Sequence, residues 1–240
     1  MTKLIWDAVG EHTYETGVDH GVLYQVTDTG KYTGGVAWNG LTSVSESPSG
    51  AEAQKQYADN MNYLTLYSAE EFGATVEAFT YPDEFEQNDG FGRPNGVPGL
   101  HVGQQPRKSF GLVYRTKVGN DVAGDDAGYK LHLIYGCRAA PSERGYSTIN
   151  DSPEAITFSW EISTTPVQMT GFEPTSQLVV TSSDFVEQAS KTKLDLLEQV
   201  LFGTDAEGSG QGTVPTLPLP DVVKGILDGS ITTLEAALAA

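Results

Sequence analysis

The sequence has a single cysteine, few basic residues and no long hydrophobic run. Cys137 is the only cysteine among 240 residues, so no disulfide can form within the chain. No segment approaches the roughly 20 apolar residues that a membrane-spanning helix needs. Near the N-terminus, Asp7 comes too early for the hydrophobic region of a secretory signal. We therefore expect synthesis and folding in a reducing cytoplasm, with no membrane association.

Motifs for catalysis or cofactor binding are also missing. The four histidines lie far apart, and no His-Glu-x-x-His or paired-cysteine pattern predicts zinc. The aspartates within 121–126 have the composition of a calcium loop without the spacing of an EF-hand. Adjacent acids, Glu70/Glu71 and Asp83/Glu84, could serve a glycosidase, but such pairs are common on acidic surfaces. We expect no enzyme activity, metal or cofactor.

Basic residues are scarce overall and concentrated in one segment. The formal net charge is -18, from 32 acidic and 14 basic residues, which argues against binding to nucleic-acid phosphates or to an anionic membrane. Residues 107–144 nevertheless carry a net charge of +3, between segments of -11 and -10. This basic block can pair with acids of its own fold, which is the first expectation, or with an acidic face of a neighbouring copy. Its members are Arg107, Lys108, Arg115, Lys117, Lys130, Arg138 and Arg144.

Alternation of apolar and polar residues dominates the chain and predicts an all-β protein. The clearest strand is 155–162, where Ile156, Phe158, Trp160 and Ile162 share one face. Strands at 109–117 and 129–135 are separated by a Gly/Asp/Asn-rich turn, so 109–135 is predicted to form a hairpin. Further strands are expected near 20–27, 34–45, 61–67, 72–81 and 177–182. The segments 46–60 and 86–99 are predicted to be long loops.

One amphipathic helix is predicted at about 185–202. Its apolar face is formed by Leu194, Leu197 and Leu201, and Gly203 ends it. The composition then changes: 204–220 has the Gly, Ser and Pro content of a flexible linker. The last segment, 221–240, is predicted to be a C-terminal arm with short helices, the second capped by Thr232 and Glu235. The domain proper is therefore expected to span 1–203.

Several collinear segments of the chain resemble the major tail protein, or tail-tube protein, of long non-contractile-tailed phages. The two most telling are Gly35–Glu52 (GVAWNGLTSVSESPSGAE) and Asn150–Pro166 (NDSPEAITFSWEISTTP). The other matching segments are 14–24, 68–85, 103–116, 119–121 and 128–136. The resemblance covers most of 1–203, and nothing is carried over to the residues that follow.

This resemblance implies a fold and a structural role. The fold would be two antiparallel sheets packed as a β-sandwich or partial barrel, flanked by one α-helix. Copies would form rings of six, which stack into a hollow tail tube in the virion. DNA would pass through the acidic lumen without specific binding. Partners would be further copies of the chain and the tape-measure, tail-tip and tail-terminator proteins.

Candidate contacts between copies follow from the basic block and from the predicted loop 46–60. They are Glu46, Glu52, Lys55, Tyr57, Arg107, Lys108, Arg115, Lys117 and Lys130. If the basic block joins copies, reversing Arg115 and Lys117 to Glu weakens assembly more than folding. Two other hypotheses remain open from the residues alone. The chain could be a β-sandwich module that binds carbohydrate or calcium, or a hydrolase that uses paired carboxylates.

Overall fold

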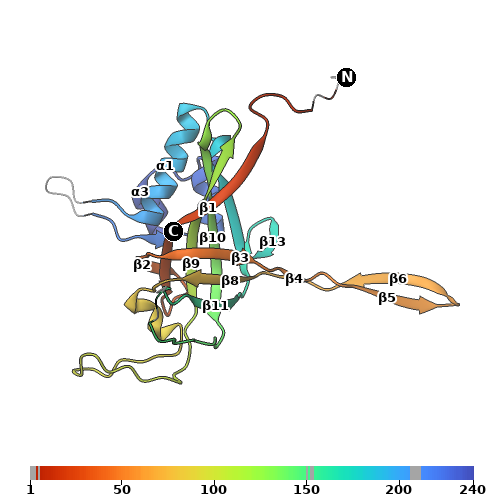
Figure 1. Ribbon diagram of the computed structural model, residues 1–240. Helices are drawn as coiled ribbons and strands as arrows, with labels where there is room; N and C mark the ends of the chain where they lie inside the picture. The colour runs from red at the N-terminus through yellow and green to blue at the C-terminus, as the bar shows by residue number, and fades with distance from the viewer. Residues whose placement is uncertain (1–3, 5, 150, 152–153, 206–211) are drawn as a thin grey trace.

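The computed structural model describes residues 4, 6–149, 151, 154–205 and 212–240. Within them, the chain forms a central antiparallel sheet with helices on one side and a long hairpin that projects from the other end (Figure 1). Nine strands are connected in the order β15-β2-β1-β9-β10-β11-β8-β3, and β14 pairs with β10. Their bounds are β1 Thr13–Val26, β2 Tyr32–Trp38, β3 Leu41–Glu46, β8 Gly73–Ala78, β9 Phe110–Asn120, β10 Gly124–Ala139, β11 Phe158–Ser163, β14 Gln177–Thr181 and β15 Thr216–Leu217. A separate short hairpin joins β12 Val167–Met169 to β13 Phe172–Thr175.

Strand β10 is long enough to pair with strands in two parts of the sheet, which we call the large leaf and the small leaf. Its first part pairs with β9 and β14 in the large leaf, which also contains β1, β2 and β15. Its end, at Arg138 and Ala139, pairs with β11 in the small leaf of β11, β8 and β3. The register shifts between Ile134 and Cys137, where Gly136 has a φ of +61° and a side chain would lie 2.2 Å from the carbonyl oxygen of Thr165. Only glycine fits this bend.

The two leaves enclose an aromatic core. Trp160 contacts Trp38 and Phe85, with ring centroids 5.6 and 5.2 Å apart, and all three side chains are buried. The indole nitrogen of Trp38 donates a hydrogen bond to the Thr80 carbonyl at 3.0 Å. Phe85 comes from the short 3₁₀ helix η1, Asp83–Gln87. The predicted all-β fold of packed antiparallel sheets is confirmed, with the addition that β10 joins the two leaves.

Three α-helices of the described residues cover the other face of the large leaf. They are α1 Gln188–Phe202, α2 Pro220–Asp228 and α3 Leu234–Ala239. Leu197, Leu201 and Ile226 are fully buried against the sheet, and the Tyr24 hydroxyl donates to the Leu201 carbonyl at 2.6 Å. The helix predicted at 185–202 is present, but it begins three residues later because Ser182–Asp184 form the 3₁₀ turn η2. The last helix is capped by Thr233, whose hydroxyl accepts from the Ala236 amide, and not by Thr232.

The segment after Gly203 contains the two short helices predicted for 221–240, as α2 and α3, and its packing ties it to the rest of the chain. The glycine-rich residues 206–211 lie outside the described residues. Thr216 and Leu217, however, form β15 and pair with Thr33 and Tyr32 of β2. Leu217 and Val223 are buried in the same core as α1. Their apolar side chains make 212–240 part of the helical layer that covers the large leaf.

Two other predictions differ in the region before β8. The strand predicted at 34–45 is two strands, because the chain turns at Asn39 and Gly40 and passes from the large leaf to the small one. The predicted loop 46–60 instead contains strands β4 Ser49–Gly50 and β5 Ala53–Ala58. β5 pairs with β6 Met61–Tyr67, and β4 pairs with β7 Glu70–Glu71. The predicted hairpin at 109–135 is confirmed as β9 and β10.

Candidate assembly surface

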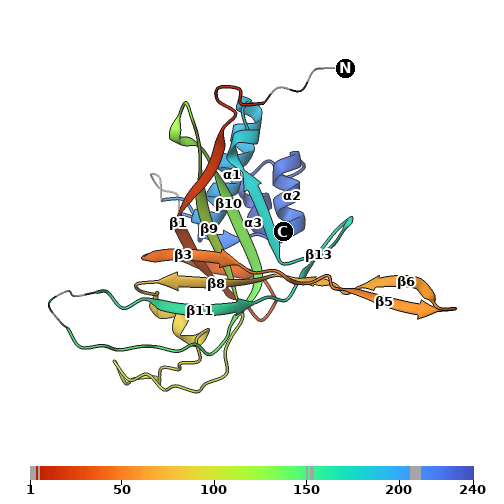
Figure 2. The same cartoon turned by 45° about the vertical axis from the view of Figure 1, so that its right-hand side comes forward.

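The β5–β6 hairpin projects far from the rest of the chain (Figures 1 and 2). Its two strands are joined by Asp59 and Asn60, which have φ angles of +51° and +62°. Two consecutive residues with positive φ are typical of the two-residue turn whose twist matches a hairpin. At the other end, the β4–β7 pair forms a neck, where Gly50 has a φ of +89° and a side chain would lie 2.3 Å from the Ala69 carbonyl oxygen. The neck therefore requires glycine.

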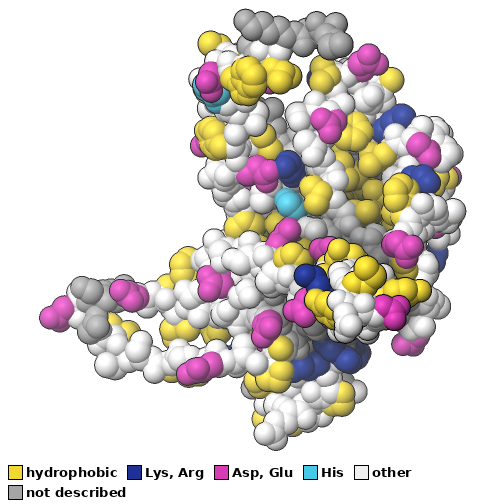
Figure 3. All heavy atoms as spheres, turned by 90° about the vertical axis from the view of Figure 1, so that its right-hand side faces the viewer, with side chains coloured by type: hydrophobic (Ala, Val, Ile, Leu, Met, Phe, Trp, Pro, Cys, Tyr) yellow, Lys and Arg dark blue, Asp and Glu magenta, His cyan; other side chains and the backbone are white. Residues whose placement is uncertain are grey.

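Both faces of the hairpin carry bare apolar side chains. By the strand register, Tyr63 and Tyr67 lie on the same face as Lys55, while Leu64 and Leu66 lie on the opposite face. Every residue of both strands is exposed except Thr65, and Tyr67 exposes 72% of its surface. Viewed from the side from which the hairpin projects, hydrophobic side chains gather near the centre of the molecular surface (Figure 3). An isolated two-stranded hairpin is only marginally stable in water. Since the side chains of this hairpin are exposed on both faces, we expect a further surface to cover them.

Glu46 lies at the end of β3, just before the neck, and is held by the body of the protein. Its Oε1 atom accepts hydrogen bonds from the Tyr114 hydroxyl and the Gln177 amide, both at 2.7 Å. His132 Nδ1 lies 3.2 Å away but is not aligned for a hydrogen bond. The His132 ring stacks on Tyr114, and burial lowers its pKa. Glu46 therefore anchors the base of the hairpin to the large leaf within its own chain.

Arg107 of the basic block is also held internally, at the buried carboxylate of Asp89. Arg107 Nη1 donates to Asp89 at 3.1 Å and to the Ala139 and Ala140 carbonyls at 3.2 Å each. Arg144 pairs with the other oxygen of Asp89. Its guanidinium lies over three aromatic rings at 5.3–5.4 Å, those of Tyr81, Phe91 and Phe158. These contacts fasten the start of the 140–157 segment to the 86–109 segment.

Arg115 and Lys130 also find their acids within the chain. Arg115 forms a two-pronged ion pair with Asp19 at 2.7 and 2.9 Å, and this pairing lowers the pKa of Asp19. Lys130 pairs with Glu15. Strand register explains the first pair, because Asp19 of β1 lies directly opposite Arg115 of β9. Of the alternatives left open by the sequence, pairing within the fold accounts for these residues and for Arg107.

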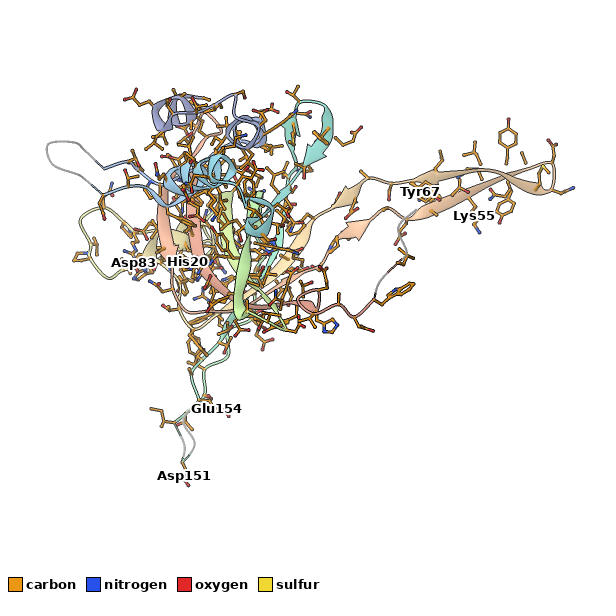
Figure 4. The ribbon with its side chains drawn as sticks, turned by 90° about the horizontal axis from the view of Figure 1, so that it is seen from above. His20, Lys55, Tyr67, Asp83, Asp151 and Glu154 are labelled. Atoms are coloured by element: carbon orange, nitrogen blue, oxygen red, sulfur yellow. The ribbon has the colours of Figure 1, made fainter. Side chains whose placement is uncertain are left out.

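The remaining candidate residues are exposed and fall in two places. Glu52, Lys55 and Tyr57 lie on or beside β5 of the hairpin, and Figure 4 shows Lys55 and Tyr67 on the projecting ribbon. Lys108 and Lys117 lie on the body with exposed side chains. Figure 4 also shows a second projection in a different direction, which carries Asp151 and Glu154. The structure thus brings only Glu52, Lys55 and Tyr57 together on one protruding surface.

Sequence reasoning missed the apolar half of the hairpin. The segment 61–67 is correctly predicted as a strand, but its bare side chains were not identified as a surface. A signal was present, because Tyr63, Leu64, Leu66 and Tyr67 place apolar side chains on both faces of one strand. A strand at an exposed position normally has one polar face, so this pattern predicts covering on both sides.

The outer face of the small leaf is mostly polar and acidic. One cross-strand row is Ser43, Glu77 and Ser159, and the next is Ser45, Thr75 and Glu161. The inward rows carry buried residues such as Val76 and Trp160. These two rows present hydroxyls and carboxylates, and the next row on this face pairs Ser163 of β11 with the exposed Arg138 of β10.

The described residues contain no group of three or more His, Cys, Asp or Glu side chains that could hold a metal ion. In the turn with calcium-loop composition, Asp121 accepts from the Gly10 amide at 3.0 Å and Asp125 from the Tyr14 hydroxyl at 2.7 Å. Cys137 is completely buried, and burial raises the pKa of its thiol. None of the described helices is long and apolar enough to span a membrane.

Comparison with known proteins gives only distant structural likeness. No protein-family model matches the chain, and no curated protein matches it. A chain in a cryo-EM structure of the anti-feeding prophage baseplate, 6-fold symmetrised, aligns with 9% identity and a TM-score of 0.34. The alignment covers 74% of the present chain and 97% of that chain. A similarity this low establishes neither a family nor a function.

Proposed function

We propose that this chain is a structural subunit of a phage tail, which assembles with further copies of itself into stacked rings and a hollow tube. The observation that carries the proposal is the β5–β6 hairpin. Its tyrosines and leucines are bare on both faces, and no described residue outside the hairpin covers them. Burying such a ribbon against another copy is the simplest way to remove this surface from water.

The position of the hairpin supports assembly over ligand binding. A ribbon that stands away from the body has no concave wall around it, whereas small-molecule sites are typically concave. The neck nevertheless has a defined conformation. Gly50 allows the β4–β7 pairing, and Glu46 anchors the strand that leads into the neck. A fixed base and bare apolar strands suit a projection that reaches a neighbouring copy.

The outer face of the small leaf supports a role in DNA passage. Two of its rows, made of serine, threonine and glutamate, offer no cation to a phosphate backbone, and the one arginine beside them, Arg138, lies at the edge where β10 joins β11. A wall of this kind would repel DNA and let it slide. We propose that this face lines the lumen, and that the tail-tip, tape-measure and tail-terminator proteins are the other partners.

The experiment that tests the proposal is negative-stain electron microscopy of the purified protein, fresh and after concentration. Hollow tubes or rings are the expected result. Where only monomers are seen, isolated tail tips are added as an initiator, and tube growth from them is expected. Monomers that neither associate at high concentration nor add to tail tips would refute the proposal. A variant with Gly-Ser residues in place of 53–67 is the control, since it keeps the neck and removes the ribbon.

A further inference from the structure

A shallow groove lies on the helix-facing side of the large leaf, where the helices leave the sheet bare. Helix α1 ends at Phe202, and beyond it the surface of β1 and β2 is open. The groove has a volume of about 500 Å³, within the range of roughly 300–1,000 Å³ that is typical of binding clefts. Phe202 and Pro215 form one wall, and His20 stands beside Phe202 with ring centroids 6.2 Å apart.

The floor of this groove is flat because its residues are small. Gly35 and Ala37 of β2 line it, and Ala37 pairs with Val22 of β1. A side chain at Gly35 would lie 2.7 Å from both Pro215 Cβ and the Tyr24 ring, so the packing of this wall requires glycine. Ala37 is exposed, and no described residue lies over it. The result is an open apolar hollow that large side chains can enter.

We propose that this groove receives the tyrosine face of the hairpin from a second copy of the chain. The inference rests on the proposed function and adds the receiving surface to it. The two surfaces are complementary: Tyr63 and Tyr67 are bulky, aromatic and exposed, while the groove floor presents the small residues Gly35 and Ala37. Each tyrosine also has a hydroxyl, and the groove rim offers His20 and Asn39 as hydrogen-bond partners.

The placement of the two surfaces makes the contact intermolecular. His20, at the groove, lies on the side of the body opposite to the hairpin that carries Lys55 and Tyr67 (Figure 4). One copy therefore cannot fill its own groove with its own hairpin. Two copies could exchange this contact reciprocally only if hairpin and groove faced the same side, and since they face opposite sides the contact repeats from one copy to the next and builds a ring or a filament. This geometry fits assembly into a tube and does not fit a closed two-fold dimer.

Cysteine cross-linking tests the contact directly, because buried Cys137 leaves introduced thiols as the reactive ones. Thr65 lies between Tyr63 and Tyr67 on the same face, so Thr65→Cys keeps both tyrosines. The double variant Ala37→Cys/Thr65→Cys is concentrated under assembly conditions, with tail tips where needed, and oxidised. The expected result is a ladder of dimers, trimers and longer products on a non-reducing gel. Each single variant should give dimers at most.

The matched control is Ala37→Cys/Gln54→Cys, since Gln54 lies on the opposite face of the same hairpin. It should assemble equally well and give no ladder. Tubes without a ladder from the Thr65 variant would overturn the groove contact and leave the proposed function intact. Equal ladders from both double variants would also overturn it, because they indicate random collision. A protein that forms neither tubes nor ladders would overturn the groove contact together with the proposed function.

Discussion

Replacing Tyr63 and Tyr67 by serine should weaken self-association strongly and leave folding unchanged. The two side chains expose 68% and 72% of their surface. A tyrosine buries about 150–250 Å² when fully covered, so covering the exposed part removes roughly 100–175 Å² from water. At about 25 cal/mol per Å² this corresponds to about 2.5–4 kcal/mol for each tyrosine. Ordering the side chain costs about 0.5–1.5 kcal/mol, which leaves about 2 kcal/mol.

The double substitution therefore removes about 4 kcal/mol from each contact between copies, which corresponds to a roughly thousandfold increase in the concentration needed for assembly. Sedimentation velocity across a concentration series measures this threshold. The urea midpoint of the monomer should not move, because neither side chain packs against the core. Phe172→Ser is the matched control, since Phe172 is 65% exposed on another strand. An unchanged assembly threshold in the tyrosine variant would refute the reasoning.

Three further predictions concern charges inside the body. Arg115→Glu should lower the urea midpoint because it destroys the ion pair with Asp19, a loss of about 1 kcal/mol for a partly exposed pair, whereas Lys117→Glu should not. Asp89→Ala should lower the free energy of unfolding by about 3–5 kcal/mol, because the largely buried guanidiniums of Arg107 and Arg144 lose their carboxylate partner. A thermal melt measures this loss, and a value below about 1 kcal/mol would contradict the role of Asp89. The Arg93 guanidinium lowers the pKa of Glu86 below its usual value, so this stabilisation is present above about pH 4.3 and disappears as the pH falls through the folded pKa. Glu86→Gln should flatten the acid limb of a stability–pH curve, and an unchanged limb would argue against it.

The first of these predictions changes how the double reversal of Arg115 and Lys117 would be interpreted. Reversing Arg115 and Lys117 together would damage folding through Arg115, so a loss of tubes from that variant would not identify a contact between copies. The sequence left both pairings open because of register: Asp19 and Arg115 become neighbours only when β1 pairs with β9. Charge counts along the chain cannot show which acids lie opposite which bases.

Strands with an apolar core face could be predicted from the sequence, and β5 could not. β11 has strict alternation, with Trp160 and Ile162 buried and Glu161 exposed, which is the pattern of a half-buried strand. In β5 the sequence is Ala-Gln-Lys-Gln-Tyr-Ala, which has no apolar period. Its extended form depends on pairing with β6 through the Asp59–Asn60 turn. A strand that is held only by its partner leaves little trace in its own residues.

The charge of the chain determines which force can drive assembly. With a net charge of -18, copies repel one another, and this repulsion grows with each copy added. Arg107, Arg115, Lys130 and Arg144 cannot offset it between copies, because they already pair with acids inside the fold. If copies assemble as proposed, assembly depends on apolar burial at the hairpin, and it should strengthen when salt screens the repulsion. Raising the ionic strength from about 0.05 M to about 0.5 M should therefore lower the assembly threshold measured by light scattering. A threshold that rises with salt would show instead that ion pairs between copies hold the assembly together. The basic residues of 107–144 would then be the first candidates for those ion pairs.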